Sequence, residues 1–107
     1  MQFKELKARV ESINFNELRE NSDDYFEAVV SNVELPKLNI IFKEFFGLPV
    51  WPSEQELPLY IKDVIKDSGG IGPGQTLYLY SQGNNTIFAM LWPWQDKQQT
   101  TIKIVNR

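Results

Sequence analysis

The side chains able to do chemistry in this chain form a short inventory, because its 107 residues include no cysteine and no histidine. Thiol nucleophiles, disulfide frameworks, structural zinc sites, Ser-His-Asp triads and imidazole bases all need one of those two residue types. Carboxylates, lysines, tyrosines, serines and threonines remain as candidate catalytic groups. The composition therefore excludes several large classes of enzyme.

The densest group of carboxylates is Asp23, Asp24 and Glu27. Carboxylate oxygens are ligands that Mg²⁺ and Ca²⁺ accept, but these three residues have no diagnostic spacing and no second cluster to complete a site. A charge run at the boundary of an element is usually solvated, and we interpret this one in that way. We therefore expect no metal site, no cofactor, no catalytic residue and no enzymatic activity.

A glycine-rich segment, residues 69–76, fits the phosphate-loop pattern G-x-x-x-x-G-K-[ST] except that Gln75 replaces the lysine. A phosphate loop follows a strand and begins a helix, so that helix N–H groups face the phosphate. Here a helix is predicted before the segment and a strand after it. We interpret the segment as a connector, with glycines at positive φ, rather than as a nucleotide site.

The most informative group is aromatic and lies in period-2 segments near the C-terminus. Alternation predicts one aliphatic face and one aromatic face for the sheet formed there. The aliphatic face is predicted to hold Leu77, Leu79, Ile87, Ala89, Leu91, Ile102 and Ile104. The aromatic face is predicted to hold Tyr78, Tyr80, Phe88, Met90, Trp92, Lys103 and Val105. Four aromatic side chains of roughly 150 to 250 Å² each exceed the largest apolar patch of a typical monomer, so this face needs a cover.

The cover is either the first helix of the chain or a binding partner: a second copy, another protein or a flat ligand. The candidate binding residues are Tyr78, Tyr80, Phe88, Trp92 and Trp94. The leading hypothesis is a small non-enzymatic protein-interaction module that associates with itself or another protein through this face or through an exposed edge of the last strand. The alternative is a small planar ligand in an aromatic pocket. The third is a stacking platform for single-stranded nucleic acid.

The first of the elements that position these residues is an amphipathic helix. Phe3, Leu6, Val10 and Ile13 are spaced by 3, 4 and 3 residues and so form one stripe of a helix. A polar connection follows, with a short helical turn expected around Leu18. The next apolar segment, Tyr25 to Val30, fits both a helical stripe and a short strand, and we favour the strand.

The choice of a strand rests on a helix start that is expected immediately afterwards. Two segments begin with S-x-x-E-L-P, at Ser31 and at Ser53, and end at Gly47 and at Gly69. S-x-x-E is a capping box, proline is tolerated in a first turn, and glycine takes the left-handed conformation at a helix end. Two capped helices are predicted. The shared pattern reflects convergent capping rather than duplication, because the helix interiors differ.

Strand-forming residues dominate after Gly69. The predicted strands are Thr76 to Ser81, Thr86 to Trp92 and Thr100 to Asn106, joined by turns at Gln82 to Asn85 and Pro93 to Gln99. The whole chain, residues 1–107, is expected to form a single α+β domain: an N-terminal amphipathic helix, a short strand, two capped helices and a three-stranded antiparallel β-meander. Trp51, between Pro49 and Pro52, is expected to pack between helix ends.

The charge balance bears on partners and location. Eleven Lys and Arg residues against fourteen Asp and Glu residues give a net charge of −3, which makes a nucleic-acid partner an unfavourable hypothesis. The first residues lack the apolar run of a signal peptide, and no apolar run approaches the ~20 residues that span a bilayer. We expect a cytoplasmic protein without a membrane partner, and a homodimer is one form of the expected association.

Overall fold

The computed structural model describes residues 2–107 and has the α+β architecture that the sequence predicts, with a five-stranded antiparallel sheet and three α-helices. In chain order the elements are α1 (Gln2–Val10), β1 (Glu17–Asn21), β2 (Tyr25–Ser31), a 3-10 turn (Asn32–Glu34), α2 (Leu35–Phe46), α3 (Leu59–Ile65), a second 3-10 turn (Lys66–Ser68), β3 (Thr76–Gln82), β4 (Asn85–Pro93) and β5 (Gln99–Asn106). The strand order is β1-β2-β5-β4-β3. The last strand is therefore central, and β1 and β3 are the two edges.

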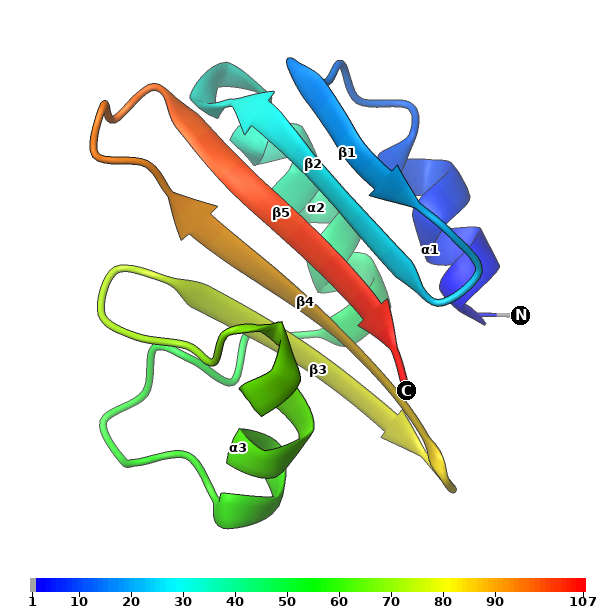
Figure 1. Cartoon of the computed structure of the whole chain (residues 1–107), viewed down its shortest axis with the longest axis vertical. Helices are drawn as coiled ribbons and strands as arrows, with labels where there is room; N and C mark the ends of the chain where they lie inside the picture. Colours follow the sequence, from blue (N-terminus) through cyan, green and yellow to red (C-terminus); the bar gives the residue numbers. More distant parts are fainter. Residues whose placement is uncertain (1) are drawn as a thin grey trace.

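The helices cover the two faces of the sheet unequally (Figure 1). In that view α1 and α2 lie behind the sheet, whereas the shorter α3 lies in front of it, beside β3 and β4. We call the side of α1 and α2 the rear face and the side of α3 the front face. Within residues 2–107, no helix covers the front of β1 and β2.

Each face has its own apolar core. The rear core joins the helices to buried residues of the strands, and these are Phe3, Leu6, Val10, Ile13, Phe26, Ala28, Val30, Leu38, Ile41, Phe42, Tyr78, Ile87, Ala89, Leu91, Ile102 and Ile104. The front core is smaller and consists of Leu57, Ile61, Ile65, Leu77, Phe88, Met90 and Val105. The predicted stripe of the first helix is thus confirmed for Phe3, Leu6 and Val10, and Ile13, which lies after the end of α1, is buried in the same core.

The N-terminal edge strand is an element that the sequence analysis missed. A helical turn was expected around Leu18, but residues 17–21 form β1 and pair antiparallel with β2. All five residues of β1 are exposed, so the strand has no buried alternate positions and no period-2 signal. Its pairing rests on backbone hydrogen bonds, such as Asn16 N–H to Val29 O at 2.8 Å beside it. The prediction of a strand over Tyr25 to Val30 is confirmed by β2.

The predicted capping boxes do not form, although both helices end as expected. Ser31 precedes the first 3-10 turn without a side-chain cap, and α2 begins at Leu35. Ser53 Oγ instead accepts a hydrogen bond from the Gln55 N–H at 3.0 Å, in a local turn, and α3 begins only after Pro58. Serine hydroxyls can bond to nearby backbone in several non-helical ways, so the pattern alone does not locate a helix start.

The predicted assignment of residues to sheet faces is wrong for β3. Tyr78 pairs with Ala89 and Tyr80 with Ile87, whereas Leu79 pairs with Phe88. Residues paired across a sheet share a face, so both tyrosines lie on the rear face with the aliphatic residues. The physical reason is the turn: because Gln82 pairs with Asn85 across two residues, even-numbered residues of β3 share a face with odd-numbered residues of β4.

Candidate functional site

The tyrosines of the predicted site contribute to the rear core. Tyr78 is 2% exposed and its ring centroid lies 5.2 Å from that of Phe42 and 5.6 Å from that of Phe46. Burial raises the pKa of Tyr78. Tyr80 is half-buried, with its ring centroid 5.6 Å from that of Phe45. The C-terminal turn of α2 therefore covers the aromatic residues of β3.

The front-face members of the predicted site also contact the chain's own residues. Phe88 is fully buried in the front core. Trp92 is half-buried, and the Lys103 ammonium lies 3.8 Å from the centroid of its ring. A Cβ added to Gly69 would lie 2.6 Å from Trp92 Cη2. Trp92 is thus in contact with both a lysine and the backbone that follows α3.

Trp94 lies in the connection between β4 and β5. Its Nε1–H donates a hydrogen bond to Thr101 Oγ1 at 2.8 Å, and the Arg19 guanidinium carbon lies 5.9 Å from the centroid of its ring. The side chain is half-buried. The five predicted site residues therefore fall at three separate places, and they do not form one continuous aromatic surface.

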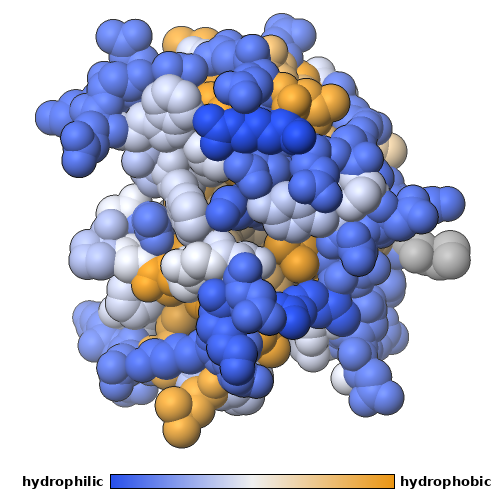
Figure 2. Space-filling model, in the orientation of Figure 1, coloured by the Kyte–Doolittle hydropathy of each residue, from blue (hydrophilic) through white to orange (hydrophobic). Residues whose placement is uncertain are grey.

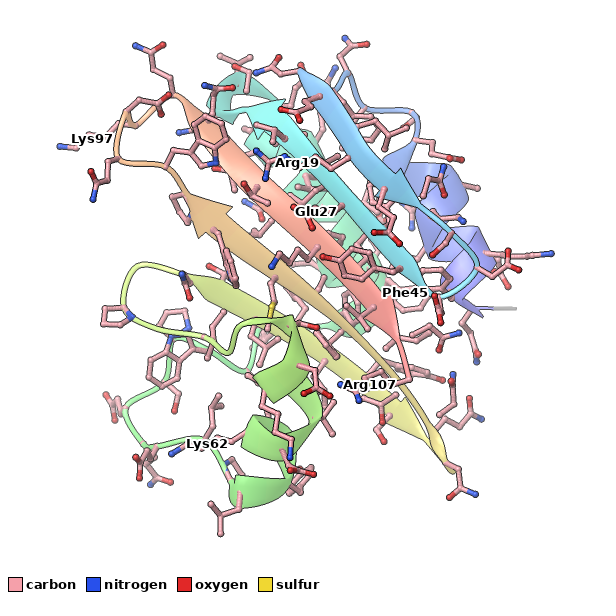
Figure 3. All side chains as sticks on the ribbon, viewed as in Figure 1. Arg19, Glu27, Phe45, Lys62, Lys97 and Arg107 are labelled. Carbon is pink, nitrogen blue, oxygen red and sulfur yellow. The ribbon has the colours of Figure 1, made fainter. Side chains whose placement is uncertain are left out.

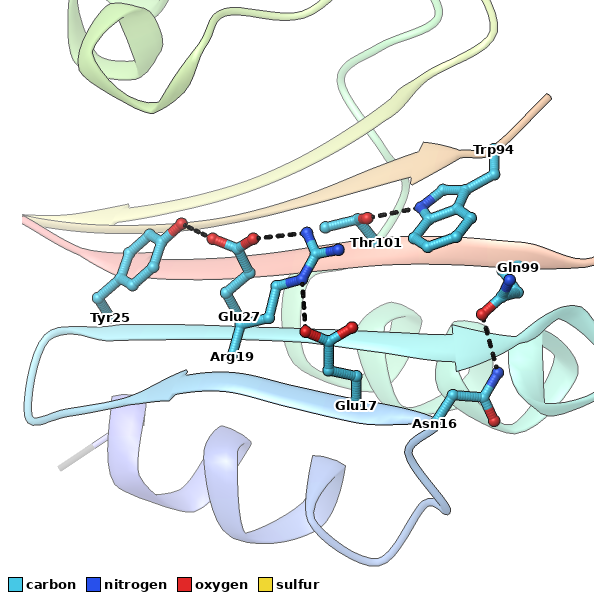
Figure 4. A network of polar contacts seen from close by, with 8 residues as sticks. All are labelled: Asn16, Glu17, Arg19, Tyr25, Glu27, Trp94, Gln99 and Thr101. Atoms are coloured by element: carbon cyan, nitrogen blue, oxygen red, sulfur yellow. Dashed lines mark hydrogen bonds and ion pairs between the residues drawn. The ribbon is translucent and has the colours of Figure 1, made fainter. Parts of the chain in front are cut away.

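A row of polar side chains crosses the front of β1 and β2, where α3 does not reach (Figure 4). Arg19 pairs with Glu27 at 3.2 Å and with Glu17 at 3.3 Å, and the Tyr25 hydroxyl donates to the other oxygen of Glu27. Figure 3 shows Arg19 and Glu27 on this part of the sheet, separate from Lys62 on α3. The row connects the edge strand to its neighbour through side chains as well as through the backbone.

The titration of this row follows from its contacts. Burial opposes ionisation of Glu27, but the hydrogen bonds from Tyr25 and Arg19, together with the charge of Lys103, outweigh it and lower the pKa of Glu27. Burial, followed by the hydrogen bond to Glu27, raises the pKa of Tyr25. Both shifts favour the bonded state at neutral pH, in which Glu27 is charged and Tyr25 is neutral. The groups satisfy one another, which is the behaviour of a structural network.

The two edges of the sheet differ in chemistry. β1 carries Glu17, Arg19 and Glu20, and its pairing with β2 is interrupted by a bulge between Leu18 and Glu20. β3 has the sequence Thr-Leu-Tyr-Leu-Tyr-Ser-Gln, with no charge, no proline and an uninterrupted register with β4. Charges and bulges prevent edge strands from pairing with other chains. β1 has both protections, and β3 has neither.

Only the beginning of the β3 edge is occupied by the chain itself. The Leu77 N–H donates to Trp51 O at 3.0 Å, and Leu77 O accepts from Val50 at 2.8 Å. The outward groups of a strand recur every second residue, so the N–H and C=O of Leu79 and Ser81 also point away from β4. Neither residue has a backbone partner on that side within residues 2–107. The second half of β3 is therefore an open edge.

A pocket of about 580 Å³ lies beside α3. Its walls come from α3, from the segment that precedes it and from the glycine-rich loop after it, and they include Trp51, Leu57, Ile65 and Ile71. Trp51 packs against the front core, beside β3 rather than between helix ends as expected, and its Nε1–H donates to Gly72 O at 3.1 Å. The loop that the sequence predicts as a connector is thus also one wall of a cavity.

Neither a metal centre nor a membrane-spanning helix occurs in the part of the chain that the structure describes. Residues 2–107 contain no group of three or more acidic side chains arranged to hold a cation. No helix over the same residues is long and apolar enough to cross a bilayer. Glu27, the partly buried member of the Asp23, Asp24 and Glu27 group, is bonded to Arg19 and Tyr25.

No protein-family model, no curated protein and no solved structure matches the chain. Its function must therefore be argued from its own surface.

The two surfaces available for binding, the open edge of β3 and the pocket beside α3, could be predicted only in part from the sequence. The last strand, β5, is central rather than at an edge, so the expected exposed edge of that strand does not exist. The uncharged run of residues 76–82 did not indicate an edge, because edge strands usually carry charges and an uncharged strand is more typical of the interior of a sheet. The pocket had no sequence signal either, since residues from 51 to 73 meet there only through the tertiary fold.

Proposed function

We propose that this chain is a non-enzymatic protein-interaction module that self-associates through the open edge of β3. The observation that carries the proposal is the outward N–H and C=O of Leu79 and Ser81, on an edge with neither charge nor bulge. Unpaired edge groups bind an added strand through main-chain hydrogen bonds. The same edge already accepts one short segment, at Trp51.

A second copy of the chain is the partner that best complements this edge. If two β3 strands pair antiparallel about a two-fold axis at Tyr80, Leu79 of each copy faces Ser81 of the other. Each such pair exchanges two backbone hydrogen bonds. Tyr80 meets its symmetry mate as the closer, non-hydrogen-bonded pair, and aromatic cross-strand pairs are stabilising. One residue of the predicted site, Tyr80, thus lies at the centre of the proposed interface.

The absence of charge in β3 favours this arrangement. Like charges that face each other across a two-fold axis destabilise an isologous interface, and β3 brings none. On β1, by contrast, Glu17, Arg19 and Glu20 are all exposed. The proposed dimer has one continuous sheet across both copies, with β1 at its outer edges.

The test is the solution mass as a function of protein concentration. Sedimentation equilibrium on the full chain is expected to show the mass rising from 12.5 kDa toward twice that value. Ser81→Pro removes one outward N–H and should lower the association constant at least tenfold. Ser81→Ala, which keeps the backbone donor, is the matched control and should associate like the parent chain.

Ser81→Lys provides a second variant in case proline disturbs β3. It keeps the N–H but places like charges near the axis, so association should weaken and recover partly in high salt. A mass that stays monomeric to millimolar concentration would refute the proposal. Loss of association in Trp94→Ala, with Ser81→Pro unaffected, would also overturn it and place the interface at the opposite end of the meander.

A further inference from the structure

The pocket beside α3 is independent of the β3 edge and has the features of a small-molecule site. Its volume of about 580 Å³ lies within the roughly 300 to 1,000 Å³ of ligand pockets. Most of its lining is apolar, from Trp51, Leu57, Ile65 and Ile71. Figure 2 shows hydrophobic residues exposed on the lower part of this view, where α3 lies. An apolar body of moderate size fits these walls.

The walls favour a flat molecule. The polar edge of Trp51 is already engaged, because its Nε1–H bonds to Gly72 O, and the ring remains as part of the wall. The loop beside this ring contributes Gly69, Gly70 and Gly72 to the lining, and these glycines leave space that side chains would otherwise fill. A planar ring laid against the indole makes a favourable aromatic contact.

The charges at the pocket favour an anion. The charged side chains that line it are Lys62, Lys66 and Glu56, so the lining carries one net positive charge in a chain whose net charge is −3. Lys62 on α3 and Lys66, the helical-conformation residue directly after it, lie four residues apart and therefore on one side of the helix. Lys66 pairs with Asp63, which lies outside this pocket, at 2.8 Å. Lys62 pairs with Glu56 at 3.0 Å.

We propose that this pocket binds a planar aromatic molecule that carries an anionic group, with its ring against Trp51 and Ile71 and its anion at Lys62 and Lys66. The two exposed ion pairs are a small obstacle, since surface pairs of this kind contribute little. The two lysines exchange their present carboxylate partners, Glu56 and Asp63, for the anion of the ligand. The ring of the ligand covers apolar pocket wall that is otherwise exposed to water. This binding does not depend on self-association through β3.

The first experiment locates the site with a probe of this chemistry. Titration of the ¹⁵N-labelled chain with 8-anilinonaphthalene-1-sulfonate should shift the amide resonances of Gly69, Gly70, Ile71 and Gly72 and the indole resonance of Trp51. Shifts confined to other exposed apolar positions, such as Leu48 or Ile40, would overturn the assignment. The uncharged analogue N-phenyl-1-naphthylamine should shift the same resonances but bind more weakly.

The second experiment tests the charges. The double variant Lys62→Gln/Lys66→Gln should weaken binding of the sulfonate probe at least fivefold and change binding of the neutral analogue less than twofold. Glu56→Gln frees Lys62 and should strengthen sulfonate binding about twofold. Lys37→Gln, on α2 behind the sheet, is the matched control and should have no effect. Equal loss of both probes in the double variant, or equal effects of the control, would refute the role of the lysines.

Discussion

At the scale of single residues, Gly69 is the position where both the backbone conformation and the packing of a neighbouring side chain require glycine. Its φ of +100° is unfavourable for any side chain, and a Cβ there would lie 2.6 Å from Trp92 Cη2. We expect Gly69→Ala to lower the free energy of unfolding by about 2 to 4 kcal/mol, combining a left-handed backbone cost with overpacking. Urea denaturation measures this loss.

Gly70 is the matched control for that substitution. Its φ is +70°, but nothing lies within 4 Å of an added Cβ. Gly70→Ala should therefore cost only the backbone contribution, about 1 to 2 kcal/mol. Equal losses in the two variants would mean that Trp92 moves aside freely, and that its contact with Gly69 does not constrain its position.

Substitution of Trp94 tests whether a half-buried aromatic residue in a turn contributes to the stability of the fold. Its Nε1–H bonds to Thr101 Oγ1, and Thr101 is only 5% exposed. Trp94→Phe keeps a ring and removes the donor, so it should destabilise the fold by about 1 kcal/mol. In a double-mutant cycle with Thr101→Val, unfolding measurements should give a coupling energy of similar size. Additive single effects would show that this hydrogen bond does not contribute to stability.

At the scale of elements, α3 is the least supported helix of the fold. It has seven residues, of which only Ile61 and Ile65 are buried, and Leu59 and Tyr60 are 82% and 66% exposed. A helix this short is unstable without tertiary packing. We therefore expect its amides to exchange with solvent much faster than those of β4 and β5, in hydrogen exchange followed by NMR. Equal protection of α3 and the central strands would show that it opens only with global unfolding.

The edge strands are the second feature decided at this scale. β1 is attached to β2 through its backbone and through the contacts of Arg19 with Glu27. β3 has a buried first half and an open second half. The protein therefore protects one edge by charge and leaves part of the other edge uncharged, which is the asymmetry on which the proposed self-association depends.

At the scale of the whole molecule, stability should depend on pH only outside the neutral range. The chain has no histidine, the residue type that ordinarily titrates near neutrality. The pKa of Glu27 is lowered from 4.5, so its contribution is fully present above pH 4.5 and is lost as the pH falls through its lower value in the folded protein. The free energy of unfolding should be flat from about pH 6 to 9 and should fall in acid.

The variant Glu27→Gln tests whether Glu27 causes the loss of stability in acid. Asp63 and Asp96 also have lowered pKa values, but they are exposed and unchanged in this variant. The stability difference between the parent chain and Glu27→Gln should therefore shrink below pH 4.5, as measured by urea denaturation at each pH. A difference that is constant from pH 3 to 7 would contradict the assignment.

Above pH 10 the raised pKa of Tyr25 works in the opposite sense, so stability should fall as tyrosine ionises in the unfolded chain.

The sequence alone determined the parts of this protein that depend on local pattern. The stripe of the first helix, the strand nature of β2 to β5 and the helix ends at Gly47 and Gly69 all follow from spacing or from backbone preference within a few residues. The absence of cysteine and histidine likewise sets the available chemistry without reference to a fold. These features are local, so neighbouring residues are sufficient to specify them.

Only the tertiary structure decided which surfaces are free. Whether Tyr78 and Tyr80 face a helix or solvent depends on which face of the hairpin α2 covers, and α2 packs on the face that holds both tyrosines. The exposed Glu17–Asn21 segment is a strand because its backbone pairs with that of β2. The pattern of its side chains does not indicate a strand. Sheet order made β5 central and β3 an edge, and the meeting of Trp51 with Ile71 created the pocket. Each of these outcomes depends on pairing between distant residues, and local sequence pattern does not specify that pairing.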